Sequence, residues 1–202
     1  MPRWAIAAIA VVVALLVASQ LLLPGIAERD VENRLTEGGG EADVSVSAFP
    51  AARLLFDDGS RFEVRASELQ LDLSERLEVF DRLDGFGEVD VLIDDFVAGP
   101  LEISSFTLTR AGDDPYHLTS VGMASPAELV DLGADQLGLP GGDVLGGLTG
   151  ITLGEAPVPI ELDMQLVSEG DGIEVAEGDS TVAGVPTGPL GELIAASIVS
   201  RL

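Results

Sequence analysis

The 202-residue chain has no cysteine and no lysine, and only 4% of its residues are aromatic. Without cysteine it can form no disulfide, thiolate metal site, iron–sulfur cluster, cysteine nucleophile or lipidated N-terminal cysteine. Because aromatics are few, the core has to be built from Leu, Val, Ile and Ala. Hydrophobic residues make up 47% of the chain, which excludes wholesale disorder. The length allows one ordinary domain or two small ones.

Positive charge is also scarce. Ten arginines stand against 35 acidic residues, for a net charge of −25 at pH 7. A protein that neutralises nucleic-acid phosphates needs a basic stripe, so nucleic-acid binding is excluded. Residues 28–110 hold eight arginines and 20 acids, whereas residues 111–200 hold 15 acids and no arginine. A contact with an anionic headgroup is therefore expected from the first half of the body. The candidates there are Arg53, Arg61, Arg65, Arg76 and Arg82.

Motifs for enzyme chemistry are missing as well. The chain has no G-x-S-x-G elbow, no G-x-G-x-x-G fingerprint and no P-loop. His117 is its one histidine, so a first-row metal site is not expected. Acidic doublets could serve glycoside hydrolysis or calcium binding, but neighbours in a strand point to opposite faces. We interpret His117 and the doublets as solvated surface or turn residues, and we expect no enzyme and no cofactor. The doublets are Asp57-Asp58, Asp94-Asp95 and Asp113-Asp114.

An apolar segment opens the chain. Residues 4–23 carry no charge and include two polar residues. At about 1.5 Å per residue this run is roughly as long as the bilayer core is thick. Since Arg3 precedes the run, the positive-inside rule predicts a cytoplasmic N-terminus. We predict a membrane anchor or signal segment over 1–27, single-pass in the cytoplasmic membrane, and one extracytoplasmic domain over 28–202. The alternatives are a cleaved signal peptide, with the body exported, and a buried core helix.

Alternation of apolar and polar residues predicts about seven strands in the body. The clearest lies over 158–166, where the apolar face is expected to be buried and Glu161 and Asp163 exposed. That face consists of Val158, Ile160, Leu162, Met164 and Leu166. The other strands are expected over 44–48, 61–65, 69–73, 89–93, 101–108 and 173–175. A register change across Ser104-Ser105 predicts a β-bulge.

Helical spacing occurs near the start, the middle and the end of the body, over 24–37, 125–137 and 188–202. The middle segment begins with a Ser-Pro-Ala-Glu capping box. The strands come in runs and do not alternate regularly with helices. The predicted fold class is therefore α+β, with a long, mostly antiparallel sheet.

Four motifs follow one another within residues 27–75: A-E-R-D-V-E-N-R-L, V-S-V-S-A-F-P, D-D-G-S-R-F-E-V-R-A-S-E-L and L-Q-L-D-L. In this order they resemble the LmeA-like family of actinobacterial envelope proteins, which bind phospholipid. The rest of the chain matches in general layout. The resemblance implies a curved sheet wrapped on helices, similar to tubular lipid-binding proteins. It also implies a role in handling envelope lipids or lipopolysaccharide-type polymers, without enzyme chemistry.

A lipid site needs a long apolar groove with few polar groups. We expect its walls beside the family-like motif and on the 158–166 face. The candidate lipid-contacting residues are Phe49, Leu54, Leu55, Phe56, Phe62, Ile160, Leu162 and Met164. The candidate headgroup residues are Arg53, Arg61 and Arg65. Two other functions stay open: a membrane-tethered structural or protein-interaction domain with no small ligand, and a hydrolase with an acidic dyad.

Overall fold

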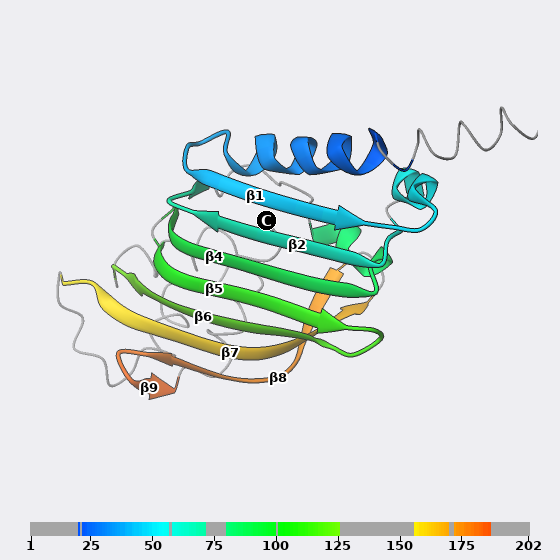
Figure 1. The fold of residues 1–202 in the computed structure, drawn as a ribbon. Helices are drawn as coiled ribbons and strands as arrows, with labels where there is room; N and C mark the ends of the chain where they lie inside the picture. Colours follow the sequence, from blue (N-terminus) through cyan, green and yellow to red (C-terminus); the bar gives the residue numbers. More distant parts are fainter. Residues whose placement is uncertain are drawn as a thin grey trace, which may run out of the picture.

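A computed structural model describes residues 20, 22–56, 58–71, 80–99, 101–125, 156–169 and 172–186. In these residues the dominant element is a curved nine-stranded sheet in the order β1-β2-β4-β5-β6-β7-β8-β9, with β3 beside β4 (Figure 1). The strands are β1 Glu41–Ser47, β2 Arg61–Ser67, β3 Gln70–Leu71, β4 Glu88–Ala98, β5 Leu101–Ala111, β6 Tyr116–Ala124, β7 Val158–Glu169, β8 Gly172–Val182 and β9 Val185–Pro186. The sheet-dominated α+β class is as predicted.

Most neighbouring strands are antiparallel, as expected, but β2 and β3 both pair with β4 in parallel. The prediction also missed two strands, β6 and the two-residue β9. In β6 the buried face includes Ser120 and Gly122, whereas Val121 and Met123 are exposed. Because small and polar residues occupy the inward positions, hydrophobicity does not alternate along β6 as it does along β7.

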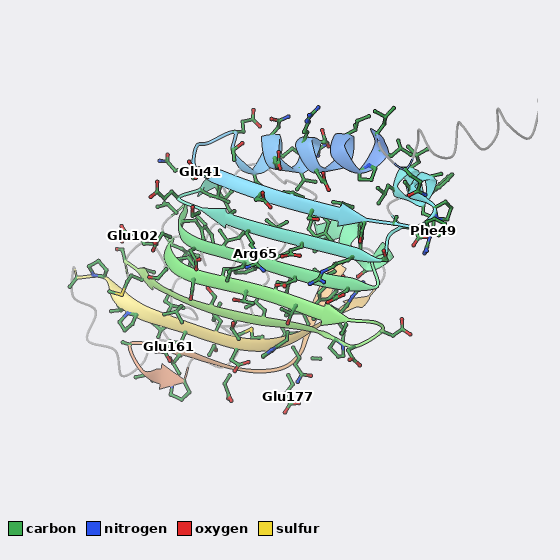
Figure 2. The ribbon with its side chains drawn as sticks, in the orientation of Figure 1. Glu41, Phe49, Arg65, Glu102, Glu161 and Glu177 are labelled. Carbon is green, nitrogen blue, oxygen red and sulfur yellow. The ribbon has the colours of Figure 1, made fainter. Side chains whose placement is uncertain are left out.

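The two faces of the sheet differ sharply. Ile160, Leu162, Met164 and Leu166 on β7 are each at most 4% exposed, while Glu161 and Asp163 are exposed. The predicted burial of this strand is thus confirmed, except that Val158 is only half-buried. The inward positions of β1, β2, β4, β5 and β6 join the same apolar core. The opposite, open face carries charged side chains, among them those labelled Arg65, Glu102 and Glu161 in Figure 2.

A line of irregular residues crosses β2 to β5. Glu68 follows β2 with a φ of 56°, and Asp95 in β4 has a φ of 50°. The pairing of β4 with β5 skips Asp95, and the pairing of β5 with β6 shifts between Ile103 and Ser105. The bulge predicted across Ser104-Ser105 is therefore confirmed. Bulges bend strands and increase their twist, so this line adds to the curvature of the sheet.

One helix covers residues 22–35, close to the predicted 24–37. It runs along β1 at the edge of the sheet (Figure 1). Its residues Val31 and Leu35 pack against the core. Two short 3-10 helices, η1 Ala51–Phe56 and η2 Phe80–Gly85, lie in the connections that follow β1 and β3. The helices predicted over 125–137 and 188–202 lie outside the described residues, except for Ser125.

Of the predicted membrane anchor or signal segment over 1–27, the structure describes only Gln20 and residues 22–27, and the rest lies outside the described residues. Within the described part of the chain, no helix combines the length and the hydrophobicity needed to cross a bilayer.

Candidate functional site

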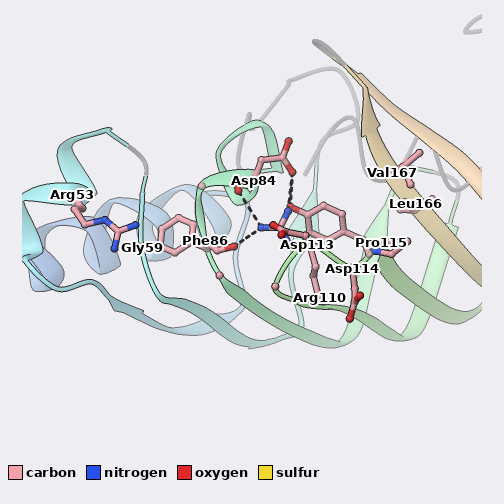
Figure 3. A pocket seen from close by; sticks show the side chains of 14 residues that line it. Arg53, Gly59, Asp84, Phe86, Arg110, Asp113, Asp114, Pro115, Leu166 and Val167 are labelled. Atoms are coloured by element: carbon pink, nitrogen blue, oxygen red, sulfur yellow. Dashed lines mark hydrogen bonds and ion pairs between the residues drawn. The ribbon is translucent and has the colours of Figure 1, made fainter.

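A pocket of about 600 Å³ opens at the end of the sheet where η1, η2 and the turn between β5 and β6 meet (Figure 3). Its lining is mixed. Charged groups come from Arg53, Asp84, Arg110, Asp113 and Asp114, and apolar groups from Phe86, Pro115, Leu166 and Val167. Since Leu166 belongs to the buried face of β7, the pocket lies on the core side of the sheet.

Backbone hydrogen bonds hold the walls of this pocket together. Gly59 N–H donates to Gly85 O at 3.0 Å, Gly87 N–H to Gly59 O at 3.1 Å, and Gly112 N–H to Gly87 O at 2.7 Å. A Cβ atom on Gly59 would lie 2.3 Å from the ring of Phe86, so a larger residue would push that ring aside. These bonds tie the start of β2, the η2 segment and the β5–β6 turn into one structured rim.

Arg110 is the central side chain of the rim. Its side chain is only 9% exposed, and its guanidinium lies 4.4 Å from the centre of the Tyr116 ring. The two N–H groups of Nη2 are shared among the carbonyl oxygens of Leu83 at 2.9 Å, of Asp84 at 3.2 Å, and of Phe86. A guanidinium can serve several acceptors at once because its donors form a fixed fork. Arg110 therefore fastens η2 to the end of β5.

Asp84 joins Arg110 to Tyr116. Its Oδ1 accepts hydrogen bonds from Arg110 Nη1 at 3.1 Å and from the Tyr116 hydroxyl at 2.8 Å (Figure 3). Burial raises the pKa of Tyr116 well above its usual value, and the hydrogen bond to Asp84 raises it further. The Tyr116 hydroxyl consequently stays protonated and acts as a donor, not as a base at neutral pH.

The charges in the pocket do not cancel. Arg53 donates to Asp58 through Nε at 2.7 Å, and this hydrogen bond raises the pKa of Arg53 and lowers that of Asp58. Arg110 is likewise paired with Asp84. Asp113 and Asp114 are exposed, and no arginine of the described residues forms an ion pair with either. Among the residues that the structure describes, the pocket therefore has an excess of negative charge.

The candidate lipid-contacting residues divide into two groups. Phe62, Ile160, Leu162 and Met164 are core residues with at most 4% exposure. Leu54 is half-buried and packs against the core. In contrast, Phe49, Leu55 and Phe56 are 82%, 67% and 82% exposed. The structure does not bring the eight residues together along one groove, and none of them lines the 600 Å³ pocket.

Of the three candidate headgroup residues whose side chains the structure describes, only Arg53 lines the pocket. Arg61 and Arg65 lie on the open face of β2. Arg61 is 3.6 Å from both Glu63 and Glu88, and Arg65 is 2.9 Å from Glu63. Arg65 also lines a second hollow, of about 760 Å³, between the 22–35 helix and the neighbouring strands.

Sequence reasoning did not single out Arg110, Asp84 or Tyr116. The available signal was an arginine near the end of a strand, separated by one alanine from a Gly-Asp-Asp turn. Arg76 and Asp57 lie outside the described residues, as does the side chain of Arg82.

The acidic candidates that the structure describes form no metal site. In the described parts of the chain, no three acidic or histidine side chains are grouped closely enough to hold a metal ion. Asp94 and Asp95 are exposed on β4, and only Asp113 and Asp114 contribute to the pocket. His117, as expected, is a surface residue, and its Nε2 lies 2.7 Å from Asp163 on the open face.

Comparisons with known proteins identify no relative. No protein-family model matches the chain, and no match was found among curated proteins or solved structures. The pocket and its surroundings therefore have to be interpreted from their own chemistry.

Proposed function

We propose that the protein is a membrane-anchored, extracytoplasmic protein that binds a phospholipid and takes part in handling cell-envelope lipids or polymers. The supporting observation is the mixed lining of the 600 Å³ pocket, which combines charged side chains with an apolar wall. A volume of this size is typical of ligand sites, and a lining of both kinds suits an amphiphile better than a purely polar substrate. The resemblance of residues 27–75 to the LmeA-like family supports the same function.

In this proposal the acyl chain lies against Phe86, Leu166 and Val167. Because Leu166 belongs to the buried face of β7, a chain that enters here reaches the core side of the sheet. Each buried methylene contributes about 0.8 kcal/mol. The predicted wrapping of the sheet on helices, as in tubular lipid-binding proteins, would enclose such a chain and belongs to the same proposal.

The headgroup lies among the charged residues of the rim. Because Arg53 and Arg110 are already paired with carboxylates, the charges that remain unpaired among the described residues of the rim are those of Asp113 and Asp114. An amine-bearing, zwitterionic headgroup complements these carboxylates, whereas an anionic headgroup is repelled by them. We therefore expect the protein to prefer zwitterionic over anionic phospholipids. Binding should change little with salt, because methylene burial supplies most of the free energy.

Lipid retention tests this function. The full chain is purified from bacterial membranes in a mild detergent, and native mass spectrometry counts the phospholipids that stay bound. Val167→Glu places a charge in the apolar wall and should reduce retention several-fold. Val121→Glu is the matched control, since Val121 is 47% exposed on the open face. Equal retention by both variants would contradict the pocket assignment. A folded parent protein that retains no lipid would favour a tethered interaction domain instead.

A further inference from the structure

Three large apolar side chains are exposed together where β1 ends. They are Phe49, Leu55 and Phe56, which we call the apolar tip, and each is at least 67% exposed. Single exposed apolar residues are common in soluble proteins, but a group of them on one turn marks an interaction site. Phe49 is labelled in Figure 2, next to η1.

The apolar tip has a defined structure. The η1 turn buries Ala51 completely, and Arg53 N–H donates to Pro50 O at 3.0 Å. The Arg53–Asp58 ion pair closes the turn on its other side. Because the backbone is held in this way, the apolar side chains project outward from a supported turn.

The helix over 22–35 begins beside the same end of the sheet. Glu28 contacts the backbone N–H of Val46, and Glu32 contacts that of Val44, so the helix runs antiparallel to β1. Its first residue therefore lies beyond the last residue of β1, where the apolar tip follows (Figure 1). Leu22 and Ile26, on the first turns of this helix, are 63% and 62% exposed.

We propose that the apolar tip inserts into the surface of the lipid bilayer that holds residues 4–23. The uncharged run ends at Leu23, so a segment that spans the bilayer delivers the chain to the membrane surface at the start of the 22–35 helix. The tip lies at that end and carries aromatic and aliphatic side chains, as membrane-inserting surfaces do. The open face of the sheet, with its many carboxylates, is a different surface and is repelled by anionic lipid.

Insertion of the apolar tip would restrict the protein more than the membrane anchor alone. An anchor fixes only the start of the chain, whereas a second contact through the apolar tip also sets the orientation of the sheet. Arg53 belongs to the same turn and lines the 600 Å³ pocket, so insertion of the tip places the pocket next to the membrane. The inference rests on the membrane anchor of the proposed function, but it does not depend on whether the pocket binds lipid.

The absence of cysteine allows a direct test on the full chain. Phe56→Cys and, as a control, Val121→Cys each provide one site for an environment-sensitive fluorophore. The labelled proteins are reconstituted into phosphatidylcholine vesicles that contain lipids with a nitroxide quencher near the headgroup. We expect the label at position 56 to be quenched several-fold more than the label at position 121, and to be protected from aqueous iodide.

Two outcomes would overturn the inference. Equal access of iodide to both labels would show that the tip stays in water. Protection from iodide without quenching by the nitroxide lipids would show that protein covers the tip, either a second copy or another chain. A further variant separates insertion from folding: Phe49→Ser with Phe56→Ser should abolish lipid quenching of a label at Leu55→Cys, with the circular dichroism spectrum unchanged.

Discussion

The carboxylate of Glu28 accepts a 3.0 Å hydrogen bond from the backbone N–H of Val46. Glu32, one helical turn later, lies 3.4 Å from the N–H of Val44. The i, i+4 spacing of the helix thus matches the i, i+2 spacing of the edge strand. An uncovered edge offers free N–H groups to other strands, so these two side chains both position the helix and protect β1 from edge-to-edge association.

Replacing these carboxylates should therefore weaken the fold and expose the edge. We expect Glu28→Ala to lower the free energy of unfolding by about 1 kcal/mol, as is usual for a lost hydrogen bond. Glu28→Ala with Glu32→Ala should also increase self-association. Denaturant unfolding and light scattering measure the two effects. Glu37→Ala, which removes an exposed carboxylate beyond the same helix, should change neither. A double variant as stable and as monomeric as the parent would contradict this role of the edge contacts.

The two faces of β7 should respond differently to charge. Leu162→Asp buries an unpaired carboxylate at a position that is 4% exposed, and should prevent folding. Glu161→Lys changes the neighbouring exposed position and should cost less than about 0.5 kcal/mol. Circular dichroism during thermal unfolding distinguishes the two variants. Similar losses of thermal stability in both variants would show that the two faces of β7 are assigned wrongly.

Arg110 should be the most sensitive residue of the pocket rim. Arg110→Met keeps much of the apolar stem but leaves the carbonyl oxygens of Leu83, Asp84 and Phe86 without this donor. We expect a loss of about 2–4 kcal/mol, the range for breaking a buried, hydrogen-bonded charge. Arg110→Lys should recover little of it, because an ammonium cannot reproduce the fork of donors. Denaturant unfolding provides the measurement, and full rescue by lysine would argue against the multiple contacts.

Tyr116 is the single tyrosine of the chain, so its ionisation can be followed directly by ultraviolet absorbance. Burial, together with the hydrogen bond to Asp84, raises the pKa of Tyr116 in the folded protein. At any alkaline pH the folded protein should therefore show less tyrosinate than the urea-unfolded chain, which should titrate near about pH 10.

The same shift makes stability depend on pH. A folded-state pKa above the unfolded value contributes stability that is fully present below about pH 10 and is lost as the pH rises further. Tyr116→Phe should remove this alkaline loss. If the folded and unfolded chains titrated together, the Tyr116 hydroxyl could not be buried as the structure has it.

Local sequence patterns were sufficient to predict part of the fold. Alternation over 158–166 predicted the buried face of β7, and the register change at Ser104-Ser105 predicted a bulge. Both are determined by residues close together in sequence, because a strand places successive side chains on opposite faces. The same rule failed for β6, where Ser120 and Gly122 take inward positions. A Cβ on Gly122 would lie 2.6 Å from the carbonyl oxygen of Glu102, so only the packing of β5 explains that glycine.

The candidate site shows most clearly what could not be predicted from the sequence. Phe56 and Phe62 lie six residues apart and were predicted to have the same role, yet the structure exposes the first and buries the second. Asp84, Arg110 and Tyr116 come from η2, β5 and β6, and no local pattern connects them. By itself the sequence determined the composition of the core, the class of the sheet and the face of its regular strands, since these depend on periodicity. The meeting of η1, η2 and the β5–β6 turn was decided only by the tertiary structure, because the order and curvature of the strands bring those distant segments to one end.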